Sequence, residues 1–149
     1  MPPNGLDYQT LLSVYNDHTN VVNTLWSILQ VVSVALLGFV YQQKQLRRNW
    51  LALLILSAAF SIFAFGNQAA MSRSQKVLVA VVYQMKNEYL LNTIPEKSGI
   101  KSVLRAHEAR RVEDMHRDHS VFSVGVVLLI WITFMMGRLK DRKDVDKKE

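Results

Sequence analysis

Three apolar blocks that contain no charged residue and no histidine constrain this chain more than any other feature of its sequence. The blocks cover 21–41, 50–66 and 121–137 of the 149 residues. A helix needs about 20 apolar residues to cross about 30 Å of hydrocarbon, and neutral flanking residues lengthen the two shorter blocks to that size. A buried helix of a soluble protein usually keeps a charged stripe on one side, which the second and third blocks lack. The sequence therefore predicts an all-α membrane protein with three transmembrane helices.

The segments beside these blocks are polar enough to lie outside the bilayer. Apolar spacings of three and four predict a helix over 72–91, and Pro95 and Gly99 predict a turn after it. Interleaved acidic and basic residues over 100–118 predict a second, solvated helix, so we expect an extramembrane helical hairpin between the second and third spans. The resulting segments are an extramembrane N-terminal helix (1–20), transmembrane helices (21–41, 50–66 and 120–138), a short basic loop (42–49), the hairpin (67–119) and a mobile charged tail (139–149).

The distribution of lysine and arginine predicts the orientation in the membrane. The loop at 42–49 carries three of these residues, the chain from Arg138 onward carries six, and the first 20 residues carry none. The hairpin segment carries nine, so the raw counts tie, but the density and the contrast across the first span favour a cytoplasmic loop and tail with the N-terminus outside. We expect a location in a bacterial inner membrane.

Composition limits the partners and the chemistry. The net charge of +6 in a membrane protein is typical of topology signals and of contact with anionic headgroups. The basic residues alternate with acidic ones and have few aromatic neighbours, so we expect the lipid bilayer and no nucleic acid as a partner. The absence of cysteine excludes disulfides, thiolate metal sites and cysteine nucleophiles.

The first span carries a stripe of uncharged polar side chains at spacings of four, three, four and three. At about 100° per residue these side chains share less than a quarter of the helix circumference. An amide that faces lipid loses its hydrogen bonds to water at a cost of a few kcal/mol. The stripe is therefore predicted to face either another helix, where amides hydrogen-bond across the interface, or water in a pore. Its members are Asn16, Asn20, Asn23, Ser27 and Gln30.

Ser57 and Ser61 in the second span form a pair of small residues separated by three positions. Such a pair allows another helix to approach closely. The pair supports either a packed bundle or an oligomer and does not decide between them. The amide stripe calls for a partner, and identical copies of the chain are the simplest one.

The histidines suggest a metal site as an alternative. His116 and His119 lie one helical turn apart, Glu113 precedes His116 by three residues, and His18 precedes the first span. The Glu-x-x-His spacing occurs in helical carboxylate metal sites, and these ligand types suit zinc, iron or copper. The competing interpretation is that interfacial histidines only cap and hydrate helix ends. We therefore expect no cofactor, with a metal ion as the alternative.

Signatures of catalysis are missing from the sequence. It contains no phosphate-binding glycine loop, no Gly-x-Ser-x-Gly and no His-Glu-x-x-His. We therefore expect a protein that is not an enzyme, namely a homo-oligomeric membrane protein that forms a pore or perturbs the bilayer and is gated through its hairpin. The alternatives are a non-catalytic accessory subunit of a larger membrane complex and a membrane metal-binding protein.

Overall fold

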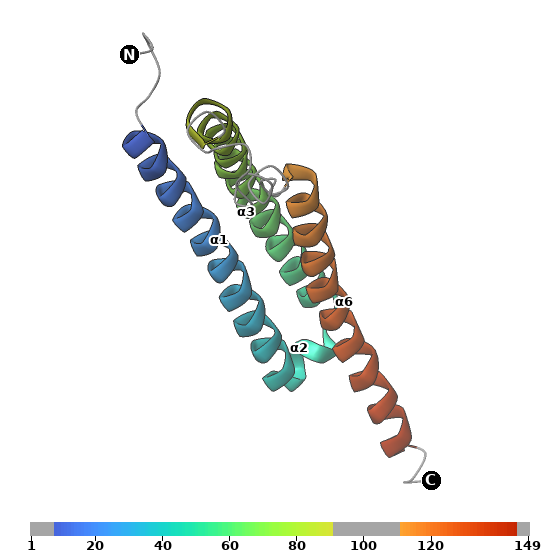
Figure 1. Ribbon diagram of the computed structural model, residues 1–149. Helices are drawn as coiled ribbons and strands as arrows, with labels where there is room; N and C mark the ends of the chain where they lie inside the picture. The colour runs from blue at the N-terminus through green and yellow to red at the C-terminus, as the bar shows by residue number, and fades with distance from the viewer. Residues whose placement is uncertain (1–7, 91–110, 146–149) are drawn as a thin grey trace. The chain divides into compact units, whose positions relative to one another are not determined.

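The computed structural model describes residues 8–90 and 111–145, and these residues are almost entirely helical (Figure 1). The elements are α1 (Tyr8–Gln42), α2 (Lys44–Arg48), α3 (Trp50–Gln84), the π-helix η1 (Met85–Leu90) and α6 (Val112–Val145). No strand occurs in the two described ranges. The prediction of an all-α fold is confirmed for this part of the chain.

Three of the helical segments are long and apolar enough to cross a membrane: Gln9–Gln42, Trp50–Asn87 and Val112–Leu139. Only 17%, 28% and 17% of the most apolar stretch of each segment is buried within the chain. The outward-facing residues include Val34, Ile62 and Phe65, each more than 70% exposed. Water disfavours so large an apolar surface, whereas hydrocarbon does not. The distribution is consistent with an integral membrane protein.

The helices extend beyond the predicted transmembrane blocks. Helix α1 begins at Tyr8 and runs without interruption through the first block, and α3 continues past Gly66 to Gln84. Helix α6 begins at Val112, ahead of the third block, and continues to Val145, through much of the tail that was predicted to be mobile. Once a helix is nucleated, each further residue adds a backbone hydrogen bond at little cost. Residues 91–110, which include the predicted turn of the hairpin, lie outside the described residues.

The segment predicted as a loop at 42–49 contains a helix of its own. Helix α2 covers Lys44–Arg48 and ends at Asn49, whose backbone N–H donates to the carbonyl of Leu46 at 3.1 Å. The side-chain Oδ1 of Asn49 then accepts hydrogen bonds from the backbone N–H groups of Leu51 and Ala52, at 3.1 and 3.2 Å. The first N–H groups of a helix have no partner inside the helix. Asn49 therefore ends α2 and caps the N-terminus of α3.

The chain divides into two compact units. The first comprises Met1–Leu25 and Ala69–His116, and its buried residues include Leu11, Met71 and Met115. The second comprises Trp26–Gln68 and Arg117–Glu149. Its core is a cluster of seven side chains that are at most 4% exposed, drawn from α1, α3 and α6: Leu29, Val40, Leu53, Phe60, Ala64, Val126 and Ile130.

Candidate functional site

The polar face of α1, defined as Asn16, Asn20, Asn23, Ser27 and Gln30, is exposed along its whole length. Because α1 is one continuous helix, the spacing of four and three keeps these side chains on one face. None of the five is buried against another helix of the described chain. Among the residues that the structure describes, no helix covers this face.

The next position in the same spacing is apolar instead of polar. Val34 follows Gln30 by four residues, and its side chain is 71% exposed. The face is thus polar as far as Gln30 and apolar at Val34.

The two serines of the predicted packing pair face different environments. Ser57 is buried at 8% exposure, and its hydroxyl makes no hydrogen bond within the part of the chain that the structure describes. Ser61 is exposed, and its Oγ donates to the backbone carbonyl of Ser57 at 2.8 Å. Ser57 therefore contributes to close packing inside the second unit, whereas Ser61 lies at its surface.

A buried polar cluster in the second unit joins α3 to α6. The imidazole of His119 is 1% exposed, and its Nε2 lies 3.1 Å from Oδ1 of Asn67, which is 7% exposed. An amide oxygen only accepts hydrogen bonds, so Nε2 carries the proton and donates. The other ring nitrogen, Nδ1, lies 3.4 Å from the hydroxyl of Ser123, which can donate or accept. Both ring nitrogens of His119 are thus engaged.

An aromatic side chain from α1 completes this cluster. The ring of Trp26 lies 5.6 Å from the ring of His119 and 6.4 Å from that of Phe122, in the latter case edge to face. Such pairs add to the energy gained from burial. The His119 cluster, namely Trp26, Asn67, His119 and Ser123, therefore ties three helices of the second unit together at one level.

The geometry gives no support to the predicted metal site. In residues 8–90 and 111–145, no group of three or more His, Asp or Glu side chains is placed to hold a metal ion. Both ring nitrogens of His119 are within hydrogen-bond distance of other side chains, those of Asn67 and Ser123. Nε2 of His116 lies 3.0 Å from the hydroxyl of Ser72. Glu113 is exposed, and Nδ1 of His18 is buried with no hydrogen bond among the described residues.

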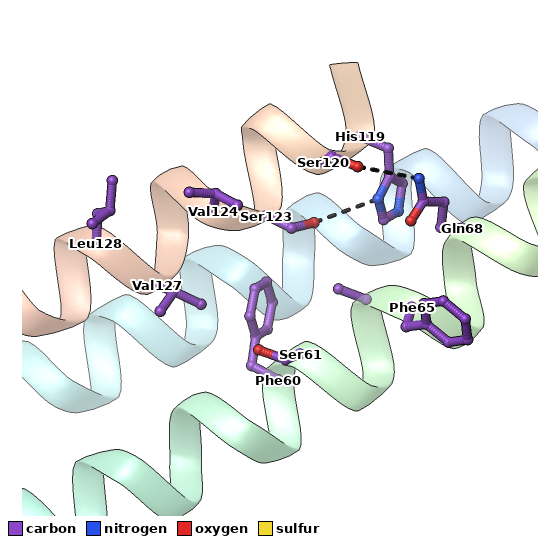
Figure 2. Close-up of a pocket in the computed structure, with 11 residues that line it drawn as sticks. Phe60, Ser61, Phe65, Gln68, His119, Ser120, Ser123, Val124, Val127 and Leu128 are labelled. Atoms are coloured by element: carbon purple, nitrogen blue, oxygen red, sulfur yellow. Dashed lines mark hydrogen bonds between the residues drawn. The ribbon is translucent and has the colours of Figure 1, made fainter. Parts of the chain in front are cut away.

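A groove of about 350 Å³ lies between α3 and α6 in the second unit (Figure 2). At one end, Nε2 of Gln68 donates to the hydroxyl of Ser120 at 3.2 Å, next to the His119 cluster. From there the lining continues towards Phe60 on α3 and Leu128 on α6 and becomes mainly apolar. Ser61 lies beside Phe60, and its hydroxyl donates to the backbone carbonyl of Ser57. The groove is lined by Phe60, Ser61, Ala64, Phe65 and Gln68 from α3 and by His119, Ser120, Ser123, Val124, Val127 and Leu128 from α6.

Neither the partner of His119 nor the groove was predicted from the sequence. One signal was present: Asn67 directly follows the second apolar block, and His119 directly precedes the third. Consecutive spans that run in opposite directions bring such end positions to the same level. Whether two such side chains meet also depends on the rotation of each helix about its own axis. That rotation cannot be predicted from the spacing of residues.

No known protein family, curated protein or solved structure matches this chain.

Proposed function

We propose that the protein is a homo-oligomeric integral membrane protein whose copies surround a water-filled path lined by the polar face of α1. One observation carries the proposal: all five side chains of this face are exposed, although Asn23, Ser27 and Gln30 lie within an apolar segment long enough to cross a bilayer. An amide has two donor hydrogens and an acceptor oxygen. Hydrocarbon is an unfavourable environment for amide and hydroxyl groups whose hydrogen-bonding capacity is not fully used, so we expect water or protein to cover this face.

Identical copies of the chain are the simplest way to cover the polar face of α1. Cyclic symmetry brings the same face of every subunit to one axis, and each α1 then presents its polar side chains to the others. Uncharged amides and hydroxyls admit water and polar solutes without an electrostatic barrier of their own. In the proposed orientation the N-terminus lies outside, and the extramembrane hairpin between the second and third spans senses a ligand or partner and gates the path.

Two measurements on the full chain test this proposal together. Native mass spectrometry of the purified protein in mild detergent should give a single polypeptide at one fixed copy number above one. Vesicles loaded with a fluorescent dye should lose it when the protein is reconstituted, alone or with cell extract. A monomer together with sealed vesicles would refute the proposal. Co-purification of different polypeptides at fixed stoichiometry would instead identify an accessory subunit of a larger complex.

Val34 gives a prediction about gating. If the apolar end of this face forms a constriction, Val34→Asn should hydrate it and raise the dye-release rate, by about tenfold for each roughly 1.4 kcal/mol removed from the barrier. Ile28→Asn is the matched control, because Ile28 is also exposed on α1 but lies about 120° away from the stripe. Equal release rates for the two variants would show that Val34 does not narrow the path.

A further inference from the structure

We propose that the groove between α3 and α6 binds one acyl chain of a bilayer glycerolipid, with the ester and glycerol oxygens of the lipid held by Gln68 and Ser120. The groove lies entirely in the second unit, and its lining residues come from two helices that hydrogen bonds join directly. This inference does not depend on the proposed pore.

The order of polar and apolar residues along the groove matches that of a lipid in one leaflet. Gln68 and Ser120 mark the polar end, and they lie where the second uncharged block ends and the third begins. Phe60 and Leu128 mark the apolar end. The eight-residue step from Gln68 to Phe60 corresponds to about 12 Å along a helix. A chain that enters the groove from the interface therefore runs towards the bilayer centre, as lipid tails do.

The chemistry of the lining selects the part of the lipid that binds. None of the eleven described residues that line the groove is charged, so the polar end suits uncharged oxygens better than a phosphate or an ammonium group. The hydroxyl of Ser120 is exposed, and a hydroxyl both donates and accepts hydrogen bonds. The volume of about 350 Å³ is at the small end of the range for ligand pockets, roughly 300–1,000 Å³, which fits one chain.

A second copy of this protein fits the groove less well. The ring contacts of Trp26 with His119 and Phe122 place Trp26 at the level of the polar end. Gln30 lies one turn further along α1, towards the apolar part of the groove. The polar face of a neighbouring α1 at the same depth in the bilayer would therefore set the Gln30 amide against apolar side chains such as Val124 and Val127, at a cost in hydrogen bonds.

The acyl chain moves from hydrocarbon into an apolar groove, so the hydrophobic effect contributes little to its affinity. The affinity depends instead on hydrogen bonds and on the fit of the chain to the groove. The test uses the full chain reconstituted in dioleoylphosphatidylcholine and then examined by native mass spectrometry in mild detergent. We expect one lipid per chain to persist at collision energies that remove all others. The double variant Gln68→Leu with Ser120→Ala should lower that occupancy about fivefold or more, as expected for the loss of one or two hydrogen bonds.

A matched pair of tryptophan variants tests the location. Val124 lines the groove and Leu129 does not, and both are exposed apolar residues of α6, at 57% and 48%. Val124→Trp should remove the retained lipid, and Leu129→Trp should leave it in place. Equal retention by the two variants, or a graded series of adducts in the wild type, would overturn the proposal.

Photolabelling of the wild-type protein locates the bound lipid without any substitution that could impair folding. A phosphatidylcholine that carries a diazirine in its acyl chain should label the lining residues Val124, Val127 and Leu128 more than Ile132 and Met135, which are exposed on the same helix outside the groove. Excess unlabelled dioleoylphosphatidylcholine should suppress only the preferred labelling. Uniform labelling of the exposed positions would show ordinary lipid contact, and protection of the groove in the oligomer alone would show a second copy there. Either result would contradict the proposed site.

Discussion

Replacing Asn23, Ser27 and Gln30 together by leucine is expected to dissociate the proposed oligomer and to abolish dye release. Each of these side chains is exposed, and a leucine side chain can face lipid without a hydrogen bond. Polar contacts between membrane helices contribute on the order of 1 kcal/mol each. Three such contacts at each subunit boundary therefore correspond to an association constant lowered by about 100-fold or more. Native mass spectrometry against protein concentration measures this change.

The matched control replaces three exposed apolar residues of the same helix. Val21, Ile28 and Phe39 are 44%, 42% and 51% exposed and lie about 120–140° around the helix from the stripe. The triple variant Val21→Leu, Ile28→Leu and Phe39→Leu should keep both the copy number and the dye release of the wild type. If the leucine stripe variant also retains its copy number and its dye release, the polar face of α1 has no part in assembly or permeation.

Replacing Asn67 by leucine is expected to lower the free energy of unfolding by about 2 kcal/mol, because the substitution leaves the buried Nε2–H of His119 without its acceptor. His119→Phe alone should cost a similar amount, since it removes a hydrogen bond from the Asn67 amide, which is 7% exposed. Phenylalanine still presents a ring to Trp26, which lies 5.6 Å from the imidazole ring. Unfolding by sodium dodecyl sulfate in mixed micelles, followed by circular dichroism, measures both losses.

The double variant Asn67→Leu with His119→Phe separates the contribution of the hydrogen bond to stability from that of side-chain burial. Replacing both members of a buried hydrogen bond by apolar groups is nearly neutral, so the double variant should recover most of the stability that either single variant loses. The double-mutant cycle then gives a coupling energy of about 1–3 kcal/mol. Ser61→Ala is the control, because Ser61 is exposed and its hydroxyl donates to the backbone of its own helix, so its loss should cost less than about 0.5 kcal/mol. Strictly additive losses would show that Asn67 and His119 act independently.

Much of the fold could be predicted from local sequence properties. Apolar blocks free of charge predict helices that can cross a bilayer, because helix hydrogen bonds are local and hydrocarbon leaves the backbone no other partner. The ends of the helices were less predictable. Helix α1 already begins at Tyr8, and α6 extends from Val112 to Val145, well beyond the blocks, because helix elongation continues across polar residues and stops only at a specific capping or breaking signal.

The helix period is enough to place five polar side chains on one face of α1 and Ser57 and Ser61 on one face of α3, because residues three and four apart lie on the same side. Tertiary packing adds what the period leaves open. Among the described residues the α1 face is exposed, Ser57 is buried while Ser61 is exposed, and His119 contacts Asn67. A rotation of one helix about its axis would exchange buried and exposed faces without any change in the spacing of residues. That rotation is set by the packing of side chains from α1, α3 and α6 in the common core, which involves residues far apart in the sequence.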